Sequence, residues 1–551
     1  MTHDPITLSL PVSAYQLGVI ATALGIALLT GLIALILSEQ GRNRPRDPAT
    51  VLAAFAWAMV PVWLVTFAAT LWQVWQLLTG APTVLIGPGS LGAGALIAAL
   101  LGAPFVVWGT VLKQRTVDFQ KEGHITDRIT SAVEQLGAEK TVKKGGKEST
   151  EPNIEVRIGA ILSLERIAQD STRYDKGRDH VRVMEILCAY IRENSRARPP
   201  RDPWRKRHED ARQRWDGPPD DFDLAFCTDH GITPTDLSDL TSVAAASREI
   251  AAFPKPRADI AQALLVLGRR TADQRRVEAA WPEPPTDQTI WPFDLPCPEL
   301  REATENAPLS GSEIAAFKTK LVAWRDTLQR YSGYQLDLRG ANLQAADLSA
   351  KRPDRSDAVF AGALLEHARM EGAVLWNARM EGANLSEARM EGAGLWSARM
   401  QGANLWYARM VGANLSSARM EGADLSDARM EGADLSRARM EGAFMWHTGM
   451  EGADLSLARM EGANLSDAKF DASTNWRDAL LGAASVQSAD FTNTPISADQ
   501  INQTFGDGTT KLPDHIPRPA HWPKAELSRS TFQTELEKYR ANPDAYTPPD
   551  P

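Results

Sequence analysis

The sequence has few cysteines, no excess of basic charge and none of the common catalytic motifs. Its three cysteines in 551 residues, Cys188, Cys227 and Cys297, form no CxxC pair. This spacing argues against a disulfide framework and a cysteine-rich zinc site, and it indicates a reducing compartment for the part outside any membrane. The formal net charge of −9 provides no global positive field, so nucleic acid is not an expected partner.

Motifs for nucleophilic or metal-assisted catalysis are also absent. The nine histidines include no HExxH spacing, and the sequence contains neither a GxSxG elbow nor a GxxxxGK phosphate loop. Residues 87–92 match G-x-G-x-x-G, but they lie in an apolar run with no preceding strand, so we interpret the match as a coincidence. We therefore predict that the protein is not an enzyme and that it binds no metal or cofactor.

Two long runs near the N-terminus contain no charged residue, at 5–38 and 48–112. A membrane span needs about 20 apolar residues, because its backbone polar groups must be satisfied within a helix across the hydrocarbon. The first run holds one span at 14–37. The second holds two, at 51–79 and 83–112. We predict that residues 1–112 anchor the chain in a lipid bilayer through three spans.

Basic residues flank these spans on one side only. They lie in the first loop and directly after the third span: Arg42, Arg44, Arg46, Lys113, Arg115 and Lys121. Loops on the cytoplasmic side of a membrane carry an excess of Lys and Arg. The N-terminus is therefore predicted to lie outside, and all residues after Leu112 are predicted to lie in the cytoplasm.

Apolar residues next recur at helical spacing, as at Ile125, Ile129 and Val133. A similar stripe predicts a helix over 179–193, and a flexible basic stretch is expected at 140–147. Prolines then become frequent before further helical patterns appear. The predicted boundaries are a helical adaptor at 113–194, a proline-rich linker at 195–257 and helical segments at 258–331.

From Ala358 the chain repeats a ten-residue unit made of two pentapeptides. Every fifth residue from Phe360 to Phe470 is Leu, Met or Phe, and Ala stands two places earlier in all but one unit. A helix with 3.6 residues per turn cannot keep such residues on one side, and neither can a strand with period two. A square coil of four pentapeptides can, with the large residue and the Ala pointing inward and the other three outward.

This pattern resembles the pentapeptide-repeat family, whose motif A(D/N)LXX matches Ala383 to Glu387. The resemblance implies a right-handed quadrilateral β-helix, which we place at 332–496. A cap and a proline-rich tail are expected at 497–551, with a capping helix from Ser497 to Phe505. The helix predicted near Ile314 is expected to cap the other end of the rod, because open solenoid ends expose unpaired backbone groups.

The predicted fold class is therefore mixed, with N-terminal transmembrane α-helices, a cytoplasmic α-helical adaptor and a C-terminal β-helical solenoid. The layout, including Glu155-Val156-Arg157 and Leu164-Glu165-Arg166, also resembles bacterial membrane-anchored pentapeptide-repeat proteins. That resemblance implies a location in the bacterial inner membrane.

Because one coil holds twenty residues, arginines should stack in ladders on two opposite faces, each beside a ladder of outward-pointing glutamates. The arginine ladders are Arg369, Arg389, Arg409 and Arg429 on one face, and Arg379, Arg399, Arg419, Arg439 and Arg459 on the other. Some soluble pentapeptide proteins mimic DNA and bind type II topoisomerases, which gives an alternative function as an inhibitor or protector of such an enzyme. The arginine ladders argue against it, since mimicry needs a continuous acidic surface.

The candidate protein-binding residues are aromatic side chains at outward positions of the rod: Trp376, Trp396, Trp406, Tyr407 and Trp446. Trp376 and Trp396 are expected one coil apart on one face, and the others on the opposite face. Tryptophan is enriched at binding hot spots. The predicted function is a non-enzymatic scaffold that presents the rod to an unidentified protein partner. Association with a second copy, or cover by the adaptor or the tail, is an alternative use of these aromatic residues.

The orientation of the anchor can be tested with a reporter that is active only in the cytoplasm. We expect activity when the reporter is fused after Arg115 or after Pro551, and silence when it is fused before Ala14, because the basic residues hold their loops inside. An active N-terminal fusion would reverse the predicted topology.

Overall fold

In the computed structural model, residues 129–551 form one compact unit and residues 1–128 form another. The structure describes residues 75, 79, 125–145, 147–196, 201–230, 232–234, 237, 242–302, 309–350 and 358–549. The three predicted spans lie outside these residues, apart from Trp75 and Thr79 in the second. Within the described ranges, no helix combines the length and the apolar character that crossing a bilayer requires.

The described part begins with a β-hairpin and a bundle of helices. Residues 125–136 are helical, and β1 (Glu139–Lys144) then pairs antiparallel with β2 (Lys147–Pro152). Strands thus replace the flexible stretch predicted at 140–147, with Gly145 supplying a positive φ of 58° between them. The helices that pack together are α4 (Ile154–Tyr174), α5 (His180–Ser195), α10 (Ala258–Gly268) and α11 (Ala272–Ala280).

The segment predicted as a proline-rich linker contains helices. They are α6 (Trp204–Gln213), the 3-10 turn η1 (Pro219–Asp221), α7 (Phe222–His230) and α9 (Val243–Ala251). Phe222, Phe226 and Cys227 form a small core of their own. The prolines do not prevent this, because Pro203 precedes α6 and Pro219 starts η1, where a missing N–H breaks no helical bond.

The repeats form the β-helix that the period of five predicts. Parallel bridges run over residues 337–511, and between Val359 and Lys469 they join residues twenty apart, such as Arg369 to Arg389 and Asn384 to Asn404. The central residues from Phe360 to Leu465 and the alanines two places before them are buried, including eleven methionines from Met370 to Met460. The one-residue slip in phase is also present, because Asp454 pairs with Asn475. The interruption predicted near residue 351 lies outside the described residues.

The four sides of each coil meet at tight corners. At one corner the N–H of Ala363 donates to the carbonyl of Phe360 at 3.0 Å, and Gly362 between them has a φ of +66°. A turn of this kind needs positive φ at its third residue, which glycine adopts without strain. We name the sides by their central residues: face A holds Met380, Met400 and Met420, face B Leu385 and Leu405, face C Met390 and Met410, and face D Leu395 and Leu415.

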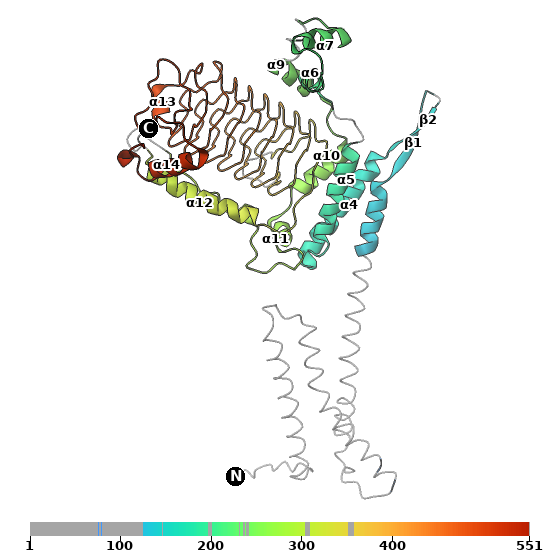
Figure 1. Ribbon diagram of the computed structural model, residues 1–551. Helices are drawn as coiled ribbons and strands as arrows, with labels where there is room; N and C mark the ends of the chain where they lie inside the picture. The colour runs from blue at the N-terminus through green and yellow to red at the C-terminus, as the bar shows by residue number, and fades with distance from the viewer. Residues whose placement is uncertain are drawn as a thin grey trace, which may run out of the picture. The chain divides into compact units, whose positions relative to one another are not determined.

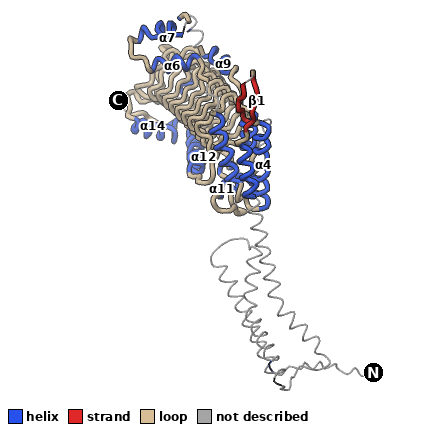
Figure 2. Tube along the Cα trace, turned by 90° about the vertical axis from the view of Figure 1, so that its right-hand side faces the viewer, coloured by secondary structure: helices blue, strands red, loops and turns tan. Residues whose placement is uncertain are grey.

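A long helix covers the glycine corner between faces A and B. Helix α12 (Gly311–Gln329) starts at a capping box between Ser310 and Glu313, and Figures 1 and 2 show it running along the coils. A Cβ added to Gly402, Gly422 or Gly462 would lie 2.9 Å from Trp324, Leu321 or Ile314, respectively. The helix pitch of about 5.4 Å is close to the spacing of about 4.8 Å between stacked coils, so roughly one turn of α12 packs on each coil.

This placement corrects the prediction that the Ile314 helix caps the N-terminal end of the rod. Helix α10 and the residues that follow it cover that end instead, where the N–H of Val359 donates to the carbonyl of Gly268 at 2.8 Å. Arg270 donates to the carbonyl of Val359 at 2.8 Å and forms a buried ion pair with Glu278 at 2.6 Å. These two bonds satisfy both backbone groups of Val359 in the first coil.

The C-terminal end of the rod has a shorter cap than predicted. Helix α13 (Ala498–Asn502) is a single turn, because Phe505 already pairs with Ser485 as part of the last coil. The predicted tail contains α14 (Arg529–Ala541), which packs on α12, and the 3-10 turn η3 (Pro543–Ala545). Together with the 3-10 turn η2 (Pro292–Asp294), these elements form one apolar cluster with α12 beside face A.

The assignment of inside and outside can be tested with the same carboxylate at two positions. Met410→Asp would bury an unpaired charge and should cost on the order of several kcal/mol of stability. Asn414→Asp should change the stability by less than about 0.5 kcal/mol. Asn414 is exposed, and Asp424 occupies the equivalent position of the pentapeptide on face B. Thermal unfolding of the two purified variants should differ clearly. Equal midpoints would contradict the inward position of Met410.

The cover by α12 can be tested with a matched pair of glycines. Gly422 and Gly432 both have a φ of +64°, but Gly422 is buried under Leu321 whereas Gly432 is exposed. An alanine at either position should cost about 1–2 kcal/mol from the left-handed backbone. Gly422→Ala should cost a further 1–3 kcal/mol, roughly, from overpacking against α12. Similar losses in chemical denaturation of the two variants would exclude a tightly packed α12.

Candidate protein-binding surfaces

The structure places Trp376 and Trp396 on face D of adjacent coils, because Val374 pairs with Gly394. Their exposed fractions are 49% and 44%. The indole Nε1 of Trp376 lies 2.6 Å from the position of a Cβ on Gly394, so the ring extends over that glycine. Gly394 therefore makes room for the ring of Trp376 on a backbone that is hydrogen-bonded on both sides, and we call Trp376 and Trp396 the aromatic strip.

The other candidate residues lie on face B. Trp406 and Tyr407 are 43% and 48% exposed and pack edge to face, with 4.3 Å between ring centroids. Trp446 lies two coils further on, where its Nε1 donates to Asp467 at 2.7 Å and the guanidinium of Arg529 lies 4.5 Å from its ring. The structure thus brings Trp406 and Tyr407 together, while the start of α14 partly covers Trp446.

The two arginine ladders occur on faces A and C, as predicted, but many of their glutamates do not point into solvent. Glu421 and Glu441 on face A are fully buried, because α12 and the segment before it lie over this face. Arg439 lies between them, with its Nε 3.0 Å from Glu421 and 3.5 Å from Glu441. Burial, together with the neighbouring charge of Glu421, raises the pKa of Glu441 to about 7.

Face C is covered by acidic residues from the segment around α6. Asp202 accepts hydrogen bonds from Arg369 and Arg389 at 2.6 and 2.9 Å. Glu209 accepts from Arg409 and Arg429 at 3.0 and 3.1 Å. Burial alone would raise the pKa of Glu209, but the bonds and charges of Arg429 and Arg409 outweigh it and lower that pKa to about 2.

Sequence analysis missed this contact. Asp202 lies two residues before α6 and Glu209 lies within it, so no single helical spacing relates the two carboxylates to the arginine ladder. Their contacts join residues 167 and 200 positions apart in the chain.

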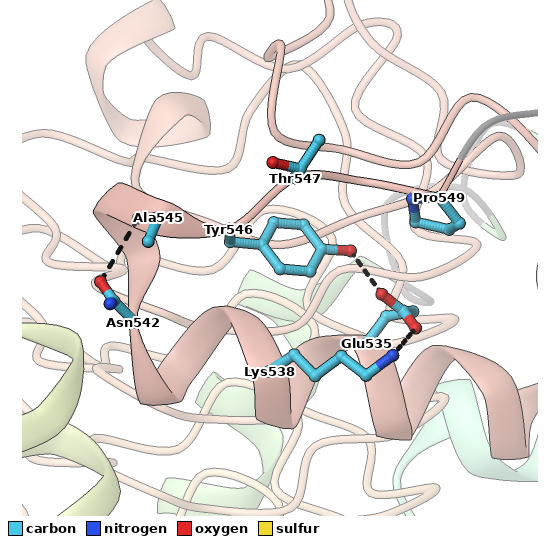
Figure 3. A pocket seen from close by; sticks show the side chains of 7 residues that line it. All are labelled: Glu535, Lys538, Asn542, Ala545, Tyr546, Thr547 and Pro549. Atoms are coloured by element: carbon cyan, nitrogen blue, oxygen red, sulfur yellow. Dashed lines mark hydrogen bonds and ion pairs between the residues drawn. The ribbon is translucent and has the colours of Figure 1, made fainter.

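No catalytic or metal-binding arrangement is found in the described part of the chain. Those ranges contain no group of three or more His, Cys, Asp or Glu side chains placed to hold a metal ion. Figure 3 shows a shallow pocket beside α14 and η3. Its charged groups already pair with one another, since Glu535 accepts from Tyr546 at 2.9 Å and from Lys538 at 2.7 Å.

Comparison with known proteins identifies the repeats. The family model for pentapeptide repeats matches residues 356–396, 397–432 and 433–471. No curated protein matches the chain. That family describes a structural repeat and not a catalytic domain.

Several solved structures are similar to the coils. HetL, a pentapeptide repeat protein involved in heterocyst differentiation regulation in the cyanobacterium Nostoc sp. strain PCC 7120, is 20% identical, with 36% of this chain and 96% of HetL covered at a TM-score of 0.26. QnrB1, a plasmid-mediated fluoroquinolone resistance protein, is 16% identical, with 32% and 83% covered at a TM-score of 0.20. Rfr23 from the cyanobacterium Cyanothece 51142 is 23% identical, with 25% and 90% covered at a TM-score of 0.15.

At these TM-scores the likenesses say nothing about what this chain binds. The family match and the twenty-residue spacing of the bridges agree on the same segment. Residues 356–471 therefore consist of pentapeptide repeats.

Proposed function

We propose that this chain is a non-enzymatic scaffold that is anchored in a bacterial inner membrane and presents its β-helical rod to a protein partner in the cytoplasm. The observation that carries the proposal is the strip of Trp376 and Trp396, which exposes two large apolar rings on adjacent, hydrogen-bonded coils. Exposed tryptophan on a rigid surface is costly unless a partner covers it, and such residues dominate binding energies.

The anchor rests on the sequence. Residues 5–38 and 48–112 contain no charge, and the three spans predicted there, followed by basic residues, support a cytoplasmic location for the rod. The ion pairs and backbone bonds between the adaptor and the first coils support a role as a rigid carrier. Arg192, for example, pairs with Asp337 at 2.6 Å, and Ser195 accepts from the N–H of Asn342 at 3.1 Å.

The ion pairs of the rod weigh against the topoisomerase alternative. Every arginine of the two ladders lies within 4.0 Å of at least one ladder glutamate. Paired charges of alternating sign weaken the continuous negative potential that a DNA mimic requires.

Partner capture from detergent-solubilised membranes tests the scaffold function. The full-length chain and the double variant Trp376→Ser with Trp396→Ser are used as bait after chemical cross-linking. We expect the double variant to retain its midpoint of thermal unfolding but to capture the partner about tenfold less, because the hot-spot rings are gone. Leu457→Ser is the matched control, since Leu457 is also on face D and is 40% exposed. Undiminished capture by the double variant would refute the strip as a binding site.

A further inference from the structure

The arginines of both ladders follow one pattern of pairing. The Nε of each lies within 3.2 Å of a ladder glutamate, which leaves the terminal nitrogens of the guanidinium for groups outside the rod. Six of the nine arginines donate a terminal nitrogen to a carboxylate of Asp202, Glu209, Asp294 or Glu299. Arg459 donates to the carbonyls of Leu300 and Arg301 instead.

Arg399 departs from this pattern. Its Nε lies 2.9 Å from Glu381, but within the described residues no group from outside the rod pairs with its terminal nitrogens. Its side chain is 44% exposed, whereas those of the other eight ladder arginines are 12% to 33% exposed. Arg439 has no outer acid either, but it lies between two carboxylates of its own ladder. Arg399 is therefore the ladder arginine that is most available to a partner.

The two neighbours of Arg399 in its ladder are paired by one segment that crosses face A. Arg379 donates to Asp294 at 3.0 Å, and Arg419 donates to Glu299 at 2.8 Å. Residues 295–298, which lie between these two acids, have the sequence Leu-Pro-Cys-Pro and carry no carboxylate. The segment therefore supplies an acid to the arginine on either side of Arg399 and none to Arg399 itself.

A missing glutamate adds to this deficit of negative charge. Gln401 stands two residues after Arg399, where the neighbouring coils of face A carry glutamate, and both its amide nitrogen and its amide oxygen are buried without a hydrogen-bond partner. Face C has a similar departure at Val411. There Glu209 supplies a carboxylate to Arg409 at 3.0 Å. Arg399 lacks the compensating acid that Arg409 receives.

The position of Arg399 places it near the aromatic strip. It follows Trp396 by three residues, around the corner between faces D and A, where Ser397 has a φ of +54°. Tryptophan and arginine are both enriched among the residues that dominate binding energies at protein interfaces. A partner that covers the exposed rings of the strip would therefore also reach the corner beside Arg399.

We infer that Arg399 receives a carboxylate of the protein partner, as Arg379 and Arg419 receive those of Asp294 and Glu299. The contact segment of the partner then combines an acidic side chain for Arg399 with an apolar side chain for the aromatic strip. This inference rests on the proposed scaffold function and names the chemistry of its partner.

The geometry of the arginine supports a carboxylate as its ligand. The terminal nitrogens of a guanidinium match the two oxygens of a carboxylate, and such charge-assisted bonds are stronger than neutral ones. The contact of Glu381 with the Nε holds the guanidinium before the partner arrives, which lowers the entropy cost of binding. A basic side chain in the same place would be repelled, so the site also selects against basic partners.

The test measures binding of labelled peptides to the purified full-length chain by fluorescence anisotropy, with detergent micelles alone as the blank. The acidic probe has the sequence of residues 291–295, Trp-Pro-Phe-Asp-Leu, because this segment already presents an acid to the same ladder. The neutral probe is the same peptide with Asp294→Asn. We expect the acidic probe to bind the unchanged chain about tenfold more tightly than the neutral probe.

Arg399→Gln should remove this preference, so that both probes bind as the neutral probe binds the unchanged chain. Arg437→Gln is the matched control. Arg437 is an exposed arginine on face D, and its loss removes the same charge but should keep the preference within about twofold. Thermal unfolding checks that both variants fold. Should Arg399→Gln unfold, Arg399→Lys replaces it. A lysine can pair with Glu381 but lacks the second set of donors, so the preference should fall below about threefold.

Three results would overturn the inference. They are no binding of the acidic probe, equal binding of both probes to the unchanged chain, and a preference that persists in Arg399→Gln. Dissociation of a dimer of the unchanged chain by Arg399→Gln would assign Arg399 to a second copy and would also overturn it.

The variant Trp376→Ser with Trp396→Ser separates this inference from the proposed function. It should weaken binding of both probes alike and keep the preference for the acidic one, because Arg399 is unchanged. Normal binding of both probes by this variant would contradict the aromatic strip, whereas loss of the preference in Arg399→Gln would still support the pairing with Arg399.

Discussion

The stacking of equivalent residues at intervals of about 4.8 Å is the constraint on which the rest of this structure depends. It buries Leu, Met and Ala in continuous columns, but it also places like charges directly above one another. Arginine columns would repel strongly without a compensating column beside them. The glutamates two residues after the arginines form this compensating column. Arg439 and Arg459 therefore each lie between carboxylates of neighbouring coils. The repeat therefore balances its own charge before any other part of the chain is added.

The same stacking turns the glycines of the repeat into grooves. A column of residues without side chains leaves a straight, narrow channel at a corner, and a helix is the element whose pitch nearly matches the coil spacing. Helix α12 uses one such channel. Its partner elements α14 and η2 then seal face A, which explains why Glu421 and Glu441 are buried as ion pairs and why the pKa of Glu441 is raised to about 7. On the opposite corner, Ile250 of α9 lies over Gly372 and Gly392.

The inside of the rod could be predicted from the sequence, whereas its cover could not. The period of five places Met410 inward without any knowledge of neighbouring segments, and the slip near Asn475 is visible in the same periodicity. The positions of α12 and Glu209 depend on contacts between residues more than a hundred positions apart, such as Lys318 with Gly462. The number of prolines also led to the wrong prediction of a linker, because Pro203 and Pro219 stand at helix starts. The repeat pattern therefore predicts which side chains point outward, but it does not predict which of them other segments of the chain cover.

Positions where the sequence departs from the repeat indicate which side chains pack against the rod there. Val411 stands where other coils of face C carry glutamate, and it lines an apolar contact with Pro203 and Ile250 from the segment around α6 and α9. Gly394 replaces a larger residue beneath the indole of Trp376. In both cases a partner within the chain accounts for the change.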